Sequence, residues 1–327
     1  MILGLLAGAF LACGDDKDTA SEEVVETTCE TTIDETNPAS GAADFYILND
    51  ITFELSEEDS TASITLTDAS GAEVSGTSSV DGDTVTFSPD ASLAPSTGYT
   101  ASLTYCGSAD PVAVDFTTSA LGEALSGSVA GKTYAVNISS GTFVKPAGVG
   151  DLLGSALNNN ILIGVVDDSN GQLQVEGAIS LEGSLEQDLC SETLVFPEAA
   201  DFSAAPYFEI PEGDLTLSIA GITATIYDLN VSGMFAADGS YFGGGELRGN
   251  LDARDLVDVI ADLVEVESAD DICGLVAGFG VACEPCSDGE QYCLSVEVVD
   301  LVADETGTEL VSVTTDDIAN NADCADE

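Results

Sequence analysis

The sequence predicts an all-β protein of two domains. The first is a β-sandwich, and the second is a larger antiparallel β-rich domain with one or two short helices and a disulfide-rich corner. Short apolar runs at period two, separated by turn-forming residues, indicate strands through most of the chain. A length of 327 residues fits about two domains. With 44% hydrophobic residues and a mean hydropathy of +0.22, the chain can form cores despite a net charge of −55.

The chain begins with an apolar run over residues 1–12, MILGLLAGAFLA. This run is too short to span a bilayer but suits the apolar core of an export signal. Cys13 follows directly after Leu11 and Ala12, and this junction resembles a bacterial lipobox, in which the signal is cut before a cysteine that receives lipid. The resemblance implies a lipid anchor at Cys13. An ordinary secreted protein and a buried apolar terminus are the alternatives.

The number of cysteines also indicates an exported protein. Nine is odd, and assigning Cys13 to lipid leaves an even set of eight that suits disulfides in an oxidising compartment. These eight are Cys29, Cys106, Cys190, Cys273, Cys283, Cys286, Cys293 and Cys324. We therefore expect an exported protein, anchored at the outer membrane or cell surface rather than located in the cytosol.

Residues 13–31 are expected to form an acidic, flexible tether. Residues 14–37 contain nine acidic residues, a single Lys and few large apolar groups. Like charges repel one another, and so little apolar surface cannot offset the entropic cost of ordering the segment.

Residues 32–120 form the predicted sandwich. Alternating apolar residues mark its strands, and Asp81-Gly82-Asp83 is a strong hairpin-turn signal. Roughly seven short strands in about 90 residues are typical of an immunoglobulin-type β-sandwich. The alternating residues are Ile51, Phe53, Leu55, Ile64, Leu66, Val85, Phe87, Leu103, Tyr105, Val112, Val114 and Phe116.

The same region resembles a known family. Residues 64–103 and the later segment DFTTS resemble the bacterial Ig-like domain of the SbsA or surface-layer type, most specifically in the L-x-P-x-T-x-Y segment from Leu93 to Tyr99. The resemblance implies a spacer or adhesive module without catalysis. Tyr99 occupies the position of a tyrosine corner, whose hydroxyl bonds back to the preceding loop. We expect Cys106 to pair with Cys29.

Residues 121–327 resemble no family that we identify, and they predict an antiparallel sandwich or small barrel. Two strand runs, 161–166 and 172–180, flank a hairpin turn, and a second hairpin turn lies at 237–240. Further alternating runs are Tyr134-Val136-Ile138, Leu215-Leu217-Ile219 and Ile222-Ala224-Ile226, and a final strand is expected at 294–303.

Helical spacing replaces strand spacing in one part of this domain. Leu256, Val259, Ile260 and Leu263 lie at helical spacing. A second short helix is expected to begin at Ser268, with Asp271 completing a capping box, and to place Ile272, Leu275 and Val276 on one face.

Four cysteines within 21 residues form the disulfide-rich corner, and the sequence allows three roles for them: a redox site, a zinc site and structural disulfides. Cys283 and Cys286 have the spacing of a dithiol redox site, and Cys273, Cys283, Cys286 and Cys293 together could hold zinc. Structural disulfides are favoured because the region resembles a loop and Glu284 opposes thiolate formation.

The composition excludes several classes of function. The absence of His removes Ser-His and Cys-His catalysis and His-ligated metals, and the large negative charge excludes nucleic acid as a partner. The glycines at 127–131 and 148–154 miss the spacings of phosphate and dinucleotide loops. We assign no catalytic, cofactor-binding or metal-binding residue, and we expect only weak, delocalised binding of divalent cations.

The sequence thus predicts a non-catalytic bacterial cell-envelope lipoprotein, in which an Ig-like spacer presents a structural or binding domain. Its expected partners are the membrane, through Cys13, and envelope proteins or glycans. Two alternatives remain open. One is a secreted carboxylate-based hydrolase with its site in residues 121–327, and the other is a thiol-disulfide oxidoreductase that uses Cys283 and Cys286.

Overall fold

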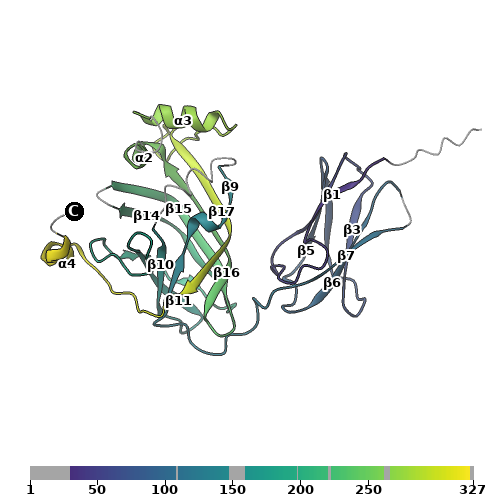
Figure 1. Ribbon diagram of the computed structural model, residues 1–327, viewed down its shortest axis with the longest axis horizontal. Coiled ribbons are helices and arrows are strands. Elements are labelled where there is room, and N and C mark those ends of the chain that lie inside the picture. Colours follow the sequence, from purple (N-terminus) through teal and green to yellow (C-terminus); the bar gives the residue numbers. More distant parts are fainter. Residues whose placement is uncertain are drawn as a thin grey trace, which may run out of the picture.

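The computed structural model describes residues 30–107, 110–146, 159–196, 198–219, 222–260 and 266–324. It contains a β-sandwich followed by a closed β-barrel (Figure 1). The predicted all-β fold class is confirmed. The predicted signal, Cys13 and Cys29 lie outside the described residues.

The sandwich consists of seven strands in two antiparallel sheets. Inward-facing residues such as Phe53 and Leu66 are fully buried between the sheets, as the period-two pattern predicts. One sheet has the order β1-β2-β5-β4, with β1 (Ile33–Asn37), β2 (Ile51–Leu55), β4 (Gly76–Asp81) and β5 (Thr84–Pro89); the other has the order β3-β6-β7, with β3 (Ser63–Asp68), β6 (Gly98–Thr104) and β7 (Val112–Thr117).

Local signals in the sequence shape this sandwich. The β4–β5 hairpin turns at Gly82, which has the positive φ (+61°) that a tight hairpin requires. Tyr99, assigned to a tyrosine corner, accepts a hydrogen bond at its hydroxyl from the Ala94 N–H (2.9 Å). Cys106 is disulfide-bonded, and its expected partner, Cys29, lies outside the described residues.

Eight antiparallel strands close the barrel. Of the sandwich and the small barrel that the sequence allowed, the structure has the barrel. The strands follow the closed order β10-β8-β17-β16-β15-β14-β13-β11, and β11 pairs again with β10. They are β8 (Thr133–Val136), β10 (Ile161–Asp167), β11 (Gln172–Ile179), β13 (Ala200–Asp201), β14 (Tyr207–Ile219), β15 (Ile222–Phe235), β16 (Tyr241–Asp252) and β17 (Cys293–Glu305).

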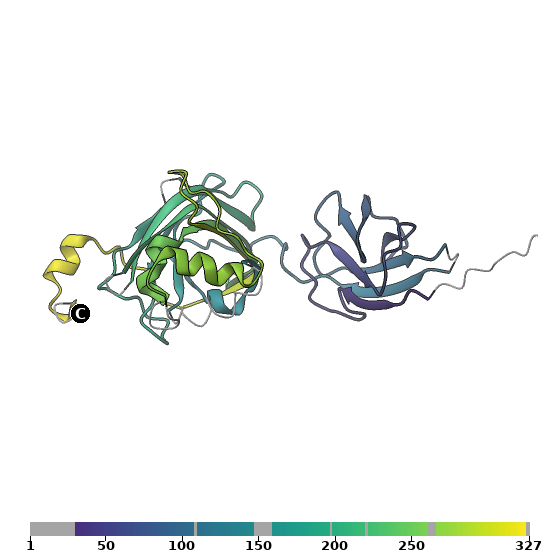
Figure 2. The same cartoon turned by 90° about the horizontal axis from the view of Figure 1, so that it is seen from above.

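Shorter elements complete the barrel domain. The 3-10 turn η1 (Ile138–Ser140) leads to β9 (Thr142–Lys145), which pairs with β17, and β12 (Leu194–Val195) pairs with β11. Helices α2 (Ala253–Ile260) and α3 (Ala269–Ala277) lie over one end of the barrel (Figures 1 and 2).

Capping groups define where these helices begin. The Asp252 carboxylate accepts a hydrogen bond from the Arg254 N–H (2.9 Å) at the start of α2. The Arg254 side chain, which hydrogen-bonds the same carboxylate, lowers the pKa of Asp252. Ser268 caps α3 and accepts a hydrogen bond from the Asp271 N–H, as the sequence predicts.

Residues 306–324, here called the C-terminal strap, return along the barrel to the loop before β12. The strap contains α4 (Thr315–Asn320) and η2 (Ala322–Cys324), which the sequence analysis did not predict. Thr193 donates its backbone N–H to the Val313 carbonyl (2.9 Å), and a disulfide joins Cys190 to Cys324. The strap is therefore fastened beside Leu194 and Phe196.

Sandwich and barrel share one apolar contact, here called the interdomain contact. Ile47 of the sandwich packs in the same buried cluster as Met234 and Ala236 of the barrel. Tyr46 lies directly against the backbone of Gly244. The sandwich thus packs against the barrel in addition to being joined to it by the covalent linker.

Across the described part of the chain, no helix combines the length and apolar character that crossing a bilayer demands.

Candidate functional site

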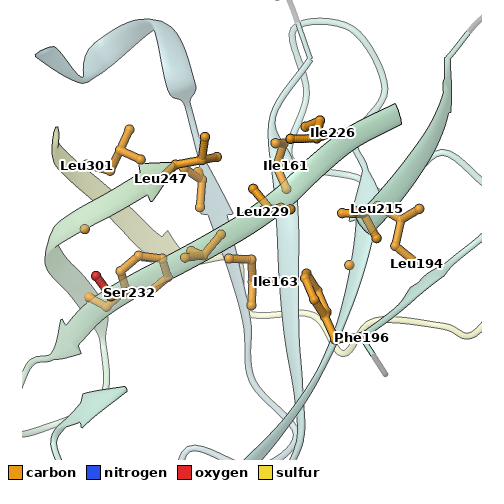
Figure 3. Close-up of a pocket in the computed structure, with 15 residues that line it drawn as sticks. Ile161, Ile163, Leu194, Phe196, Leu215, Ile226, Leu229, Ser232, Leu247 and Leu301 are labelled. Carbon is orange, nitrogen blue, oxygen red and sulfur yellow. The ribbon is translucent and has the colours of Figure 1, made fainter. Parts of the chain in front are cut away.

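The barrel lumen contains a cavity of about 40 Å³ whose walls are almost entirely apolar (Figure 3). It lies among strands on all sides of the barrel, so closure of the sheet creates it. The lining residues are Val136, Ile161, Ile163, Gly177, Leu194, Phe196, Leu215, Ile226, Leu229, Val231, Ser232, Phe242, Gly245, Leu247 and Leu301. We call this space the luminal cavity.

Strand alternation brings these side chains inward. Ile161 and Ile163 are two residues apart on β10, and Leu229 and Val231 have the same spacing on β15. Gly177 on β11 allows Leu194 to approach closely, because a Cβ at this position would lie 3.3 Å from Leu194 Cβ. The cavity is therefore built by the same period-two pattern that forms the core, with a glycine leaving space for a neighbouring side chain.

A cluster of aromatic rings fills the lumen at the end opposite the helices. The ring of Phe235 lies 4.9 Å from that of Phe208 and 5.1 Å from that of Tyr134, centroid to centroid. The Tyr134 hydroxyl donates a hydrogen bond to the Gly239 carbonyl (2.9 Å), and burial raises the pKa of this hydroxyl. This end of the barrel is a packed floor, so access to the luminal cavity must come from elsewhere.

A second cavity of about 70 Å³ adjoins the first and contains polar groups. The two share three lining residues, Phe196, Leu215 and Leu229. The other lining residues of this outer cavity are Glu198, Ile210, Pro211, Glu212, Gly213 and Asp214. The outer cavity thus leads from the apolar lumen to a rim of carboxylates.

The outer cavity lies at a discontinuity in the sheet. The only pairing between β13 and β14 in the described residues is Asp201 with Glu209. Beyond it, β14 shifts register twice between Ile210 and Leu215, and no described ladder joins β12 to β14. A bulged strand that contains Pro211 separates readily from its neighbour, since proline cannot donate to a ladder. This seam, with a single residue pair between β13 and β14, is the shortest ladder among the described strands of the barrel.

The chemistry of the luminal cavity suits binding of apolar groups. Among the described residues that line it, none carries a carboxylate, a thiol or a basic group, and Ser232 supplies the only side-chain hydroxyl. An apolar cavity of this kind stays free of ordered water and takes apolar ligands.

The disulfide-rich corner forms near α2 and α3, and its bonding differs from that of a redox or zinc site. Cys273 bonds to Cys283, and Cys286 bonds to Cys293. Cys283 and Cys286 are therefore not bonded to each other, and all four sulfurs lack the thiolate form that zinc requires. Asp252 approaches the Cys286–Cys293 pair, but a carboxylate and a disulfide do not form a ligand set for zinc.

The sequence analysis assigned disulfide candidates but no binding residues. The structure pairs Cys190, Cys273, Cys283, Cys286, Cys293 and Cys324 with one another, which confirms the predicted disulfides at these positions. The residues of the two cavities were predicted only as strand or loop residues. Two residues could have indicated these features in the sequence. Gly177, inside a strand run, indicates a place where a neighbouring side chain approaches the backbone closely, and Pro211, near a run of turn formers, indicates a break in strand pairing.

Comparison with known proteins identifies the first domain. Residues 27–118 match the model of the bacterial Ig-like domain, as the resemblance in the sequence predicts. Domains of this family occur in bacterial surface proteins, which favours an exposed position in the bacterial envelope. No curated protein matches the chain.

Proposed function

We propose that the chain is a non-catalytic lipoprotein of the bacterial cell envelope whose barrel binds a small apolar ligand. The luminal cavity is the observation that carries this proposal. The Ig-like domain acts as a spacer, and Cys13 supplies the membrane anchor. Envelope proteins or glycans are the further partners that such a location offers.

The size of the barrel supports ligand binding. Eight strands enclose an interior that side chains can just fill or that can hold one small ligand. Here the aromatic floor fills one end, while the middle of the lumen retains space that opens toward the outer cavity. Each methylene group moved from water into this space contributes about 0.8 kcal/mol of binding free energy.

The proposed location is supported by the cysteines, because disulfides such as Cys190–Cys324 persist in oxidising compartments outside the cytosol.

The interdomain contact bears on how the barrel is presented. The packing of Ile47 in one buried cluster with Met234 limits rotation of the barrel on its spacer. An acidic tether over residues 13–31 would then let the two domains move as one body above the membrane.

Ligand binding can be tested with xenon, an apolar probe of the size that a cavity of about 40 Å³ admits. We expect xenon under pressure to shift the methyl NMR signals of the lining residues in the native protein and to bind at least about tenfold more weakly to a Leu229→Phe variant, because the larger ring fills space shared by both cavities. The matched control is Val166→Phe, which adds a ring at a side chain that is 55% exposed. Circular dichroism checks that both variants fold.

Two results would contradict this proposal. An absence of xenon-induced shifts in the native protein would exclude a functional apolar site. Equal affinity of all three proteins would place the bound xenon outside the lumen.

The anchor is tested by detergent partitioning of protein expressed in a bacterium that processes lipoproteins. We expect the native protein in the detergent phase and a Cys13→Ser variant in the aqueous phase, because only a lipid at this thiol supplies the required apolar mass. A Ser21→Ala variant, altered in the same tether, should partition like the native protein. Aqueous partitioning of the native protein would refute the lipid anchor.

A further inference from the structure

The C-terminal strap crosses the outer face of the barrel at β10. Ile163 lines the luminal cavity, so its neighbour Gly164 faces the outer surface of the sheet. Leu310 of the strap lies directly against this glycine, because a Cβ at Gly164 would lie only 2.7 Å from the Leu310 Cβ. The strap therefore occupies a depression that a glycine leaves in the outer wall.

Two side chains of the loop before β12 hold the middle of the strap. The Gln187 side-chain amide donates a hydrogen bond to the Val311 carbonyl (2.8 Å) and accepts one from the Val311 N–H (2.9 Å). The Thr193 hydroxyl accepts a hydrogen bond from the Val313 N–H (2.7 Å), and the Val313 side chain is 6% exposed. The loop and the strap thus hold each other in place.

The end of the strap depends on the Cys190–Cys324 disulfide, here called the strap disulfide. The structure describes every residue of α4 and η2, and none of them is buried. Figures 1 and 2 show α4 (yellow) standing away from the strands of the barrel. A hydrogen bond from the Thr315 hydroxyl to the Glu192 carboxylate joins α4 to the loop. Without buried side chains, this part of the strap is held chiefly by the covalent bond.

The loop that the strap holds continues into the wall of both cavities. Leu194 follows Thr193 directly and lines the luminal cavity, and Phe196 lines both cavities. β12 pairs with β11 through two residue pairs, and within the described residues no ladder joins β12 to β14. A segment with so few backbone hydrogen bonds opens at a low cost in free energy. The position of β12 therefore depends on the strap.

We propose that the strap disulfide is a redox-sensitive switch that closes the barrel at β12. This inference goes beyond the proposed function and rests on it only for the luminal cavity that the switch closes. While the bond is intact, the strap is attached at two points, so a strap that detaches at one point rebinds rapidly. After reduction, the contacts of Gln187 and Thr193 hold the strap alone, and β12 opens more often.

The reductant belongs to the class of dithiols. One thiolate of the dithiol attacks a sulfur of the strap disulfide and forms a mixed disulfide, which the second thiol of the same molecule then cleaves. Two electrons and two protons pass to the protein, Cys190 and Cys324 become thiols, and the dithiol becomes a cyclic disulfide. Both cysteines are partly exposed to solvent, whereas Cys293 of the Cys286–Cys293 bond is 5% exposed. A dithiol can therefore reach the strap disulfide more readily than that bond.

The test compares amide hydrogen exchange of the native protein before and after treatment with dithiothreitol. Mass spectrometry of alkylated peptides establishes when Cys190 and Cys324 are reduced. We expect exchange in residues 187–196 and 310–314 to become at least about tenfold faster on reduction, while residues 241–252 of β16 keep their native rate. Reoxidation should restore slow exchange.

A double variant separates the strap disulfide from the other two described disulfides. Cys190→Ser with Cys324→Ser should show the fast exchange of residues 187–196 without any reductant. The matched control is Cys273→Ser with Cys283→Ser, which removes a described disulfide of the corner near α3 and should keep the native rate in this segment. Xenon followed by NMR should enter the luminal cavity at least about tenfold faster in the first double variant than in the control.

The outcomes distinguish the switch from the function on which it rests. Unchanged exchange of residues 187–196 after loss of the strap disulfide would overturn the switch and leave xenon binding intact. Fast exchange without faster entry of xenon would also overturn it, because β12 would not control access. Equally fast exchange throughout β16 would overturn it as well, since the bond would then hold the whole barrel. A native protein that binds no xenon would overturn the proposed function, and the exchange rates would still decide whether the strap disulfide holds β12.

Discussion

Replacing Phe235 with Ala is expected to lower the free energy of unfolding of the barrel by about 3–5 kcal/mol. Phe235 is 1% exposed and lies at the centre of the aromatic floor. Its ring contacts those of Tyr134, Phe202, Phe208 and Phe242, with centroids 4.9–5.9 Å apart. Truncation would leave a void that four large, mutually packed rings cannot close by small movements.

Urea unfolding, followed by circular dichroism and by tyrosine fluorescence, measures this effect. Phe279→Ala is the matched control, because the same side chain is removed from a position that is 53% exposed. Its effect should stay within about 0.5 kcal/mol of zero. A loss of less than about 1 kcal/mol in Phe235→Ala would show that the floor is loosely packed and does not hold the strands in place.

This floor illustrates what the sequence could predict and what it could not. The alternation around Tyr134 and the turn near Gly239 predicted strands here, although β8 ends at Val136 and Ile138, which was assigned to the same run, begins the 3-10 turn η1. They did not reveal that β8 pairs with β17, more than 150 residues later, and with β10. Periodicity reports which face of a strand is apolar, but the choice of partner depends on packing between distant segments. Closure of the barrel, and hence its lumen, required the structure.

The cysteines show the same limit. Export and an even set of cysteines predicted disulfides, and the near neighbours Cys286 and Cys293 do bond across a short turn. With Cys29 and Cys106 assigned to each other, the other six cysteines allow 15 connectivities, and sequence spacing alone does not choose among them. The bond between Cys190 and Cys324 spans 134 residues, and it depends on the path of the C-terminal strap along the barrel.

The candidate site was the least predictable feature for a physical reason. Side chains such as Ile163 and Leu229 look like ordinary core residues, because a cavity wall and a packed core need the same apolar groups. Whether space remains between them depends on how eight strands tilt and on where β14 bulges. The carboxylates of the outer cavity were equally unpredictable, since carboxylates occur throughout this chain and only the fold of β14 places Glu212 and Asp214 beside apolar residues of the cavity.

The interdomain contact leads to the second large expected effect. Gly244 on β16 has a positive φ (+56°), and a Cβ at this position would overlap the ring of Tyr46 from the sandwich. The Tyr46 hydroxyl is buried and has no hydrogen-bond partner among the described residues, and burial raises its pKa. The ring is therefore held by its fit against the glycine backbone rather than by a polar contact.

Gly244→Ala is expected to destabilise the protein by about 2–4 kcal/mol, of which about 1–2 kcal/mol is the cost of the left-handed backbone and the rest is the clash with Tyr46. Gly131→Ala is the matched control, because Gly131 has a positive φ (+80°) with no atom near its added Cβ, and it should show the backbone cost alone. Urea unfolding measures both changes, and small-angle scattering should show the two domains moving apart only in Gly244→Ala.

A double-mutant cycle with Tyr46→Ala then isolates the contact itself. Removing the ring deletes the clash but not the backbone cost, so adding Gly244→Ala to Tyr46→Ala should cost about 1–2 kcal/mol less than adding it to the native protein. Additive effects would mean that the ring and the glycine do not meet in solution, and the packing around Ile47 would then be the remaining part of the interdomain contact. Coupling of the expected size would show that the spacer holds the barrel in a fixed orientation.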